Sequence, residues 1–197
     1  RALQIALENR YRHLLSYRDM IIAPNGVELE RYANLPAPAE ARQQLGLPDG
    51  LTIACTGHLY SGRGGDLFLA LAARFPMQRF LWVGGRAEEV GQHRARAQQM
   101  GLQNTLFTGH VPQGDLPLHQ AAANILLMPY GRAIAGSGGG NSAEICSPMK
   151  LFDYLAAGRA ILSSDLPVIR EVIDPDCARF APPDDLEGWT TALTELI

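Results

Sequence analysis

Short apolar runs alternate with helix-like segments along most of this 197-residue chain. Predicted strands and helices follow one another in six units: 51–56 with 66–75, 79–83 with 87–100, 105–108 with 116–123, 125–128 with a helix around Lys150, 160–163 with a short helix from Pro167, and 178–181 with 186–197. Strands that alternate with helices of about 10 to 15 residues imply right-handed crossovers and a parallel sheet covered on both faces. The sequence therefore predicts an α/β fold with a doubly wound parallel sheet of about six strands.

A different pattern precedes these units. Residues 3–17 place apolar side chains on one helical face, residues 20–23 are typical of a short apolar strand, and residues 39–46 are typical of a short helix. With an apolar content of 47%, residues 19–197 fit one domain that buries a core without disulfides. We interpret residues 1–18 as a helix that precedes this domain or links it to an N-terminal domain. Because the chain begins at Arg1 rather than Met, we expect a fragment of a longer protein.

Charge and cysteine content argue against several classes of function. A formal net charge of −3 and a pI near 5.9 give no general attraction to phosphate backbones, so we expect no nucleic-acid partner. Cys55, Cys146 and Cys177 are widely spaced and lack the spacing of metal ligands, which argues against a disulfide or a metal site. No apolar run approaches the roughly 20 residues that span a bilayer. We therefore expect a reducing, cytoplasmic location.

The segment SPMKLFDYLAAG begins at Ser147 and has the pattern of a turn followed by an amphipathic helix. Leu151, Tyr154 and Leu155 recur at the spacing of one buried face, and Gly158 stands where a left-handed residue ends a helix. A strand follows directly. This arrangement is suited to presenting the N-terminus of a helix to an anion, at the end of a parallel sheet where ligands collect.

Three turns that contain glycine follow predicted strands. TGHLYSGRGG, residues 56–65, brings His58, Arg63 and the backbone amides near Gly64 to the start of a helix, where they could cradle a phosphate. A flexible turn with a surface arginine is the alternative. VGGRAEE, from residue 83, has acidic residues in its first helical turn, which argues against a second phosphate site. TGHVPQGD, from residue 108, could bind the edge of a planar base through its backbone or could be an ordinary helix entry.

The connection over residues 131–147, GRAIAGSGGGNSAEICS, is long and rich in glycine. A loop that covers a ligand and a flexible surface excursion both explain this composition. The sequence leaves the two interpretations open.

Six blocks of the chain occur in the order and approximate spacing of one known family. They are PNGVELERY, TGHLYSGRGGDLFL, FLWVGG, LFTGHVP, ANILLMPY and SPMKLFDYLAAGRAILSSDLPVIREV. In these blocks the chain resembles the nucleotide-sugar-binding C-terminal half of the family 4 (group 1) glycosyltransferases, which have the GT-B fold. The resemblance covers nearly the whole chain and implies that its sheet is the Rossmann-like half of such a fold.

The resemblance implies binding roles in the first glycine turn and in the late helix. The family's basic pair, which holds the donor diphosphate, corresponds to His58, in place of an arginine, and to Arg63, which Gly64 follows. The family's glutamate that binds the ribose hydroxyls corresponds to Asp153, whose shorter carboxylate can still accept two hydroxyl hydrogen bonds.

A second glutamate of the family falls at Ile145, one place after Glu144, so the role of Glu144 in holding the sugar stays open. Backbone amides of Ser147 and Met149 at the helix start are candidates to replace it. Lys150 either adds charge near the phosphates or is a solvated lysine in the first helical turn.

The resemblance also implies a reaction, the transfer of a hexosyl unit from a nucleoside diphosphate sugar to an acceptor hydroxyl, with retention of anomeric configuration and without a metal or other cofactor. Arg63 and the helix N-terminus at Ser147 would stabilise the departing diphosphate. The nucleotide base would meet the backbone at Gly109, His110 and Val111.

The acceptor, a glycan or a lipid-linked sugar, would bind mainly to an N-terminal half that this chain lacks. The chain alone would then bind nucleotide weakly and transfer little. Through that half the protein could also reach the inner face of a membrane. The base, the sugar, the linkage and the oligomeric state do not follow from the sequence.

Two further classes of protein share such a sheet. A sugar-nucleotide epimerase would need additional carboxylates and histidines, and a non-catalytic nucleotide-binding module would need no catalytic group at all. An NAD-dependent redox enzyme would need GxGxxG after a strand and an acidic residue about 20 positions later, and the sequence lacks this combination.

Overall fold

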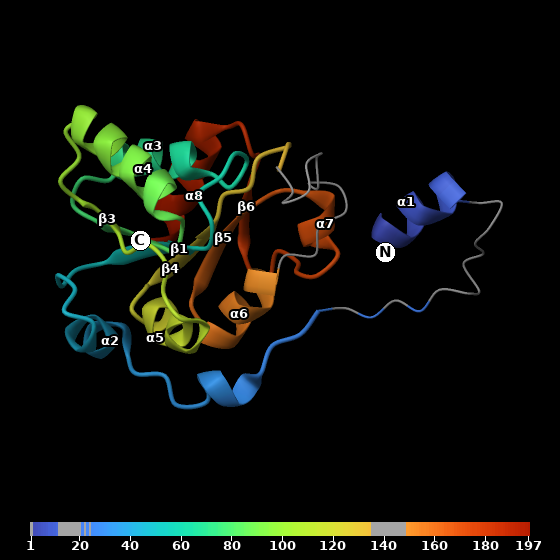
Figure 1. Ribbon diagram of the computed structural model, residues 1–197, viewed down its shortest axis with the longest axis horizontal. Coiled ribbons are helices and arrows are strands. Elements are labelled where there is room, and N and C mark those ends of the chain that lie inside the picture. Colours follow the sequence, from blue (N-terminus) through green and yellow to red (C-terminus); the bar gives the residue numbers. More distant parts are fainter. Residues whose placement is uncertain (1, 12–20, 22, 24, 135–148) are drawn as a thin grey trace.

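The computed structural model describes residues 2–11, 21, 23, 25–134 and 149–197 (Figure 1). The predicted alternation of strands and helices is confirmed, with most bounds within one or two residues of the expected ones. The elements in chain order are α1 (Ala2–Tyr11), η2 (Leu29–Tyr32), α2 (Pro38–Gln44), β1 (Thr52–Thr56), α3 (Gly65–Arg74), β2 (Arg79–Val83), α4 (Ala87–Gln99), β3 (Thr105–Phe107), η3 (Gln113–Asp115), α5 (Leu116–Ala121), β4 (Ile125–Met128), α6 (Met149–Ala157), β5 (Ala160–Ser164), α7 (Pro167–Arg170), β6 (Arg179–Ala181) and α8 (Leu186–Leu196).

The described strands form one six-stranded sheet in the order β3-β2-β1-β4-β5-β6, and every neighbouring pair is parallel. The predicted doubly wound α/β fold is therefore confirmed. The strand order reverses between β1 and β4. Ligands of such sheets bind outside the carboxyl ends of the strands at this switch point.

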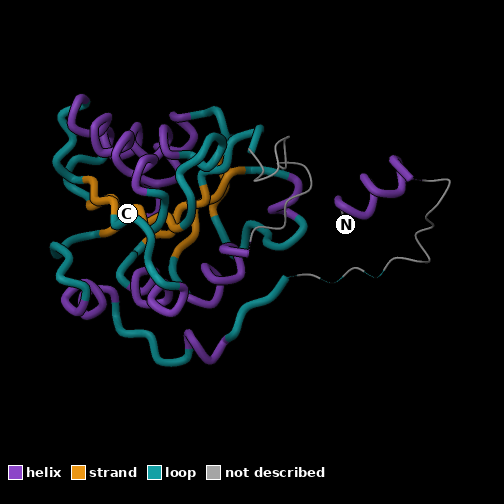
Figure 2. The backbone as a smooth tube through the Cα atoms, viewed as in Figure 1, coloured by secondary structure: helices purple, strands orange, loops and turns teal. Residues whose placement is uncertain are grey.

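Helices cover both faces of the sheet, as Figures 1 and 2 show. Successive residues of a strand point to opposite faces, and β4 illustrates this: Leu126 and Met128 join the core under α6 and α7, whereas Ile125 and Leu127 join the core under α3, α4 and α8. A strand buried on both faces reads as a continuous apolar run, and this explains why these strands could be located from sequence.

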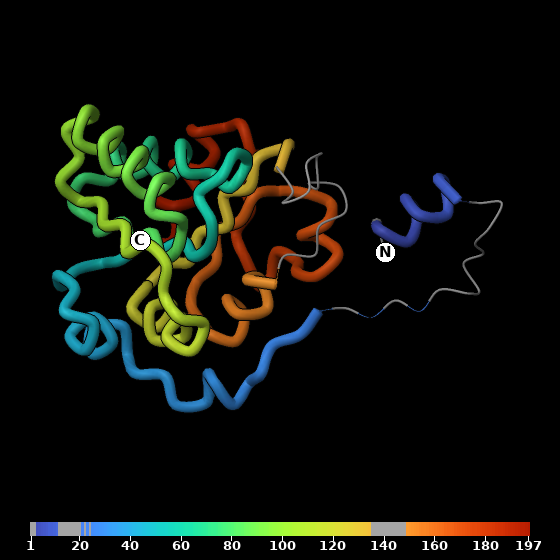
Figure 3. The backbone as a smooth tube through the Cα atoms, viewed as in Figure 1, coloured from blue at the N-terminus to red at the C-terminus, as the bar shows by residue number. Residues whose placement is uncertain are grey.

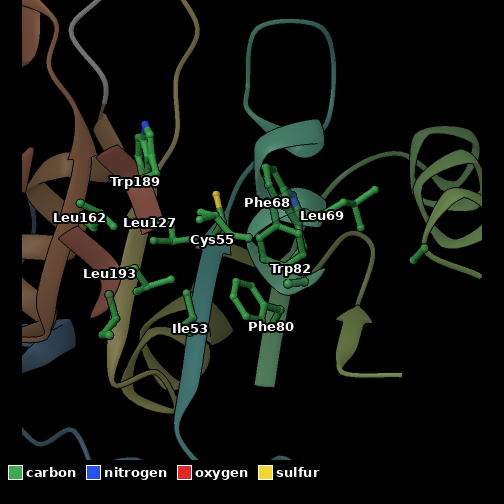
Figure 4. Close-up of a cluster of buried hydrophobic side chains, with 14 of the residues drawn as sticks. Ile53, Cys55, Phe68, Leu69, Phe80, Trp82, Leu127, Leu162, Trp189 and Leu193 are labelled. Atoms are coloured by element: carbon green, nitrogen blue, oxygen red, sulfur yellow. The ribbon is translucent and has the colours of Figure 1, made fainter. Parts of the chain in front are cut away.

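Aromatic side chains fill the core between the sheet and α3 and α8 (Figure 4). Phe68 makes edge-on contacts with Phe80, Trp82 and Phe107, with ring centroids 5.2–5.8 Å apart. Trp189 of α8 is fully buried in the same core. This layer fixes α3, whose first residue follows the glycine turn after β1.

One prediction for the N-terminal segment is not confirmed. The described residues of the expected strand at 20–23, Ile21 and Ala23, lie in no strand, and Ile21 is 95% exposed. This prediction is wrong because apolar character without a neighbouring strand does not make a sheet. Helix α1 lies apart from the helices that cover the sheet, and the segment from η2 to α2 runs past α6 and α5 (Figures 1 and 3).

Candidate donor-binding site

The glycine turns after β1, β2 and β3 meet at the carboxyl end of the sheet. Gly57 N donates to Val83 O over 2.8 Å, and Trp82 Nε1 donates to Gly57 O over 2.9 Å. Gly84 N donates to Gly109 O over 2.9 Å. The sequence segments predicted to hold diphosphate and base are thus neighbours in space.

The turn between β1 and α3 packs closely against the chain that follows β4. Gly64 has φ +88° and is the residue before α3, and a Cβ there would lie 2.0 Å from the carbonyl oxygen of Pro129. A Cβ at Gly62, where φ is +81°, would lie equally close to the carbonyl oxygen of Ala133. Only glycine allows these approaches, so the turn has one well-defined position on the segment after β4.

Arg63 occupies the centre of this turn and contacts two tyrosines. Its Nη1 donates to the hydroxyl of Tyr130 over 2.6 Å, and its Nη2 donates to the hydroxyl of Tyr60 over 3.0 Å. Burial lowers the pKa of Arg63, but the two tyrosine oxygens outweigh it and raise the pKa above its ordinary value, so the guanidinium stays charged. Its Nε is buried and has no partner among the described residues.

Lys150, in the first turn of α6, reaches the same place. Its Nζ donates to Thr56 O over 2.8 Å and lies 4.6 Å from the ring centroid of Tyr130. The alternative of a solvated first-turn lysine is therefore wrong. A long side chain whose ammonium meets the end of β1 puts a second positive charge beside Arg63.

Tyr154, one turn after Lys150, holds α6 against the switch point. The pairing of β1 with β4 ends at Ala54 and Leu126, although β1 continues to Thr56. The buried hydroxyl of Tyr154 accepts a hydrogen bond from Thr56 N at 2.9 Å and donates one to Leu127 O at 3.1 Å. It thereby joins the two strands where their own ladder stops.

Leu151 and Tyr154 are fully buried, as the amphipathic pattern of this helix predicts, but Leu155 is 38% exposed. The prediction that Leu155 belongs to the buried face is wrong, because the covered stripe of this short helix is narrower than expected. Gly158 follows the helix with φ +62°, which confirms the left-handed position expected for it.

Asp153 lies on α6 beside η2. Burial raises the pKa of its carboxyl group, and neighbouring Tyr32 and Arg31 partly offset the shift. Tyr32 is itself buried and donates to Gln120 Oε1 over 3.0 Å. The carboxylate is half-buried, a position in which a ligand hydroxyl could replace lost water.

The other predicted site residues are placed as follows. His58 is exposed and stacks on Tyr60 with ring centroids 5.3 Å apart. His110 is exposed, and Val111 packs at the edge of the core under α6. Met149 begins α6 and is 60% exposed.

Ser147 and Glu144, together with most of the glycine-rich connection, lie outside the described residues. The sequence interpretations of these positions stay predictions.

Two contributors to the site were not predicted. Tyr60 and Tyr130 both contact Arg63, and the sequence analysis assigned a role to neither side chain, although Tyr60 lies in the predicted phosphate-binding turn. The available hint was modest: one tyrosine stands three residues before the arginine, and the other stands two residues after a buried strand.

A cavity of about 540 Å³ lies beside the same turn, between α3, α4 and the segment before α8. Gly64, His93, Arg96 and Asp184 are among its lining residues. Arg63, Lys150 and Asp153 are not, so the cavity adjoins the predicted donor site without containing its charged groups. The candidate site is therefore defined by the two cations at the switch point and not by the cavity.

Comparison with known proteins shows the family to which this chain belongs. The profile of the family described as "Glycosyl transferases group 1" matches residues 50–197. The chain belongs to the group 1 glycosyltransferases. A curated relative is the phosphatidyl-myo-inositol mannosyltransferase of Mycolicibacterium smegmatis, which is 30% identical over 91% of this chain and 43% of its own length.

Solved structures show the same fold at low sequence identity. Sucrose-phosphate synthase from Thermosynechococcus elongatus matches with a TM-score of 0.77 at 21% identity, over 98% of this chain and 46% of that one. HepE from Anabaena, solved with UDP and glucose, matches with a TM-score of 0.70 at 16% identity, over 87% of this chain and 45% of that one.

The C-terminal domain of a group 1 glycosyl transferase from Francisella tularensis matches with a TM-score of 0.69 at 14% identity, over 87% of both chains. This group 1 glycosyltransferase chain thus has the fold of a GT-B C-terminal domain and spans less than half the length of the curated relatives it matches. In the part of the chain that the structure describes, no helix has both the length and the apolar character needed to cross a bilayer.

Proposed function

We propose that this chain is the donor-binding half of a glycosyltransferase that moves a hexosyl unit from a nucleoside diphosphate sugar to an acceptor hydroxyl, with retention of anomeric configuration. The observation that carries the proposal is the meeting of Arg63 and Lys150 at the end of β1, at the switch point of the sheet. The mannosyltransferase among the relatives supports a hexosyl donor, and the complex of HepE with UDP supports a nucleotide donor.

In this proposal Arg63 and Lys150 bind the diphosphate. Negative charge develops on the diphosphate as the bond to the sugar breaks, and fixed positive groups lower the barrier because they need no rearrangement at that moment. Arg63 Nε, buried without a described partner, is an available donor for a phosphate oxygen. The tight turn around Gly64 fixes this cation before the ligand arrives.

The remaining parts of the donor have matching surroundings. The carboxylate of Asp153 is proposed to accept hydrogen bonds from the ribose hydroxyls. Backbone groups of Gly109, His110 and Val111 are proposed to meet the base, since this turn bonds to the turn after β2 through Gly84, and the end of β2 bonds in turn to Gly57 of the first turn. His58, which is exposed and stacks on Tyr60, is proposed to stand in place of an arginine of the family's basic pair.

We further propose that this chain is the C-terminal part of a longer protein, as its coverage of 43% of the curated mannosyltransferase suggests. Residues 19–197 would form the nucleotide-sugar domain, and residues 1–18 would lead into it from an N-terminal domain. That domain would bind the acceptor, a glycan or a lipid-linked sugar, and would set any contact with the membrane surface. The reaction would take place in the cytoplasm, without a metal ion.

Calorimetric titration with UDP, GDP and ADP tests the donor site directly. One of the three should bind saturably, and Arg63→Ala should weaken it by about 10- to 100-fold, the range for losing a hydrogen bond to a charged group. Arg74→Ala is a matched control, because Arg74 is 45% exposed and pairs with Glu187 on the outer helices. Failure of the folded wild-type chain to bind any of the three at millimolar concentration would refute the proposal and leave a binding-incompetent member of the fold.

A further inference from the structure

We infer that Tyr130 is a positioning residue of this site, whose ring and hydroxyl hold Arg63 and Lys150 together so that both cations meet one diphosphate. The inference rests on the proposed function and adds to it a residue that no motif assigns. It predicts that Tyr130 increases the preference of the site for a diphosphate over a monophosphate and does not affect binding of the base or the ribose.

Tyr130 is itself firmly held. It stands two residues after β4, is 2% exposed, and donates its backbone N–H to Met128 O over 3.0 Å. Its carbonyl oxygen accepts a hydrogen bond from the buried Ser164 Oγ at 2.6 Å, at the end of β5. The backbone of Tyr130 is thus held by β4 and β5, and its ring extends from this fixed point into a buried position.

Both cations lie against this one ring. The Cζ atom of Arg63 is 4.8 Å from the ring centroid, and the Nζ atom of Lys150 is 4.6 Å from it. The hydroxyl of Tyr130 also accepts the 2.6 Å hydrogen bond from Arg63 Nη1. An aromatic face attracts cations by about 0.5–2 kcal/mol each, which partly offsets the repulsion between two positive groups at close range.

A tyrosine has a consequence here that a carboxylate would not have. Asp or Glu between the two cations would bind them more strongly and cancel part of their charge, whereas a neutral phenol leaves both charges available to a ligand. Among the described residues, neither Arg63 nor Lys150 forms an ion pair with a carboxylate. The geometry therefore keeps an uncompensated pair of cations ready for an anion.

An anion with two phosphates suits this pair better than one with a single phosphate. Lys150 donates to Thr56 O at the end of β1, and the side chain of Arg63 extends from the turn that follows the same strand. A diphosphate has one phosphate for each cation and can bridge Arg63 and Lys150, whereas a monophosphate can bind closely to only one of them. The expected selectivity for diphosphate over monophosphate should fall when Tyr130 no longer sets the spacing.

The experiment compares Tyr130→Phe and Tyr130→Leu with the wild type, using the diphosphate that binds best, its monophosphate and its nucleoside. Tyr130→Phe keeps the ring and should weaken diphosphate binding by about 3- to 10-fold, and Tyr130→Leu, which removes ring and hydroxyl, by about 10- to 50-fold. Binding of the nucleoside should stay within about twofold of wild type, and the monophosphate should change less than the diphosphate.

Two further variants separate positioning from general damage. Tyr60→Phe removes the other hydroxyl that binds Arg63, at 3.0 Å, but does not touch Lys150, so it should cost less than Tyr130→Leu. In an Arg63→Ala background, Tyr130→Phe should have little additional effect, because the bond that it removes is already absent. If Tyr130→Leu fails to fold, Tyr130→Phe and the double-mutant cycle with Arg63→Ala still test whether Tyr130 positions the cations.

The outcomes distinguish the two proposals. If wild type binds none of the nucleotides, the donor-binding function fails and the role of Tyr130 fails with it. If wild type binds diphosphate and both Tyr130 variants bind it equally well, only the inference about Tyr130 is overturned. An equal loss for diphosphate, monophosphate and nucleoside would also overturn it, since that pattern reports a structural role.

Discussion

Removal of one buried hydroxyl should destabilise the whole domain. In Tyr154→Phe the ring still fits its fully buried site, but Thr56 N and Leu127 O lose the partner that joins β1 to β4. The ladder between these strands already ends at Ala54 and Leu126, so no strand bond can replace the lost pair. The variant therefore leaves two buried backbone groups without a partner.

The magnitude follows from these two groups. A buried backbone donor or acceptor without a partner costs about 1–3 kcal/mol, so the loss of both should lower the free energy of unfolding by about 2–6 kcal/mol. For a domain of this size each kcal/mol corresponds to about 2–4 °C, which predicts a decrease in Tm of about 4–24 °C.

Urea denaturation followed by circular dichroism measures the change, with the m-value checked for two-state behaviour. Tyr11→Phe is the matched control, because Tyr11 is 37% exposed on α1, and it should change the free energy of unfolding by less than about 0.5 kcal/mol. If Tyr154→Phe is as stable as this control, the hydroxyl does not hold the switch point together and the reasoning is refuted.

Three further predictions concern the same end of the sheet and its surroundings. Gly64→Ala should lower the free energy of unfolding by about 3 kcal/mol or more in thermal unfolding and abolish nucleotide binding, since its Cβ would lie 2.0 Å from Pro129 O. The control Gly46→Ala, with φ +64° and no atom within 4 Å of the added Cβ, should lower it by only about 1–2 kcal/mol, and equal losses for the two variants would contradict this prediction. Asn104→Ala should cost about 2–4 kcal/mol in urea titration, because Nδ2 lies 3.0–3.1 Å from three carbonyl oxygens between the last turn of α3 and the start of β2, and an unchanged midpoint would contradict it. The pKa of Asp153 is raised in the folded state, so above about pH 4 the folded chain binds more protons than the unfolded chain, and stability falls as pH rises through that window. Asp153→Asn should therefore be more stable than wild type at pH 7, should lose this advantage below about pH 4, and should bind nucleoside more weakly. An unchanged pH profile of Tm would exclude the assigned burial effect.

Much of the fold could be predicted because the sheet is buried on both faces. The strands at 79–83 and 125–128 are predicted with the correct bounds, since nearly all their residues are apolar, and polar residues, glycine or proline flank them. The apolar run at 20–23 has similar composition and failed, because burial depends on a neighbouring strand that a local pattern does not reveal.

The site could be predicted only in part. Arg63 stood in a turn whose glycines and position after a strand indicate anion binding. The buried hydrogen bond of Lys150 to the end of β1 depends on how α6 packs, and spacing on the helix alone favoured solvent. Tyr130 could not be assigned, because its role arises from side chains that meet across 67 and 20 residues of sequence.

The bond between Thr56 and Tyr154 also sets an order of events during synthesis. The two residues are 98 positions apart, so at about 5–20 residues per second Tyr154 leaves the ribosome about 5–20 s after Thr56. A nascent chain that ends before α6 already carries β1 to β4, yet the open end of β1 lacks both groups that close it, the hydroxyl of Tyr154 and the ammonium of Lys150. Nucleotide bound at the proposed site could therefore stabilise the sheet only after α6, at the start of the last quarter of the chain, has emerged.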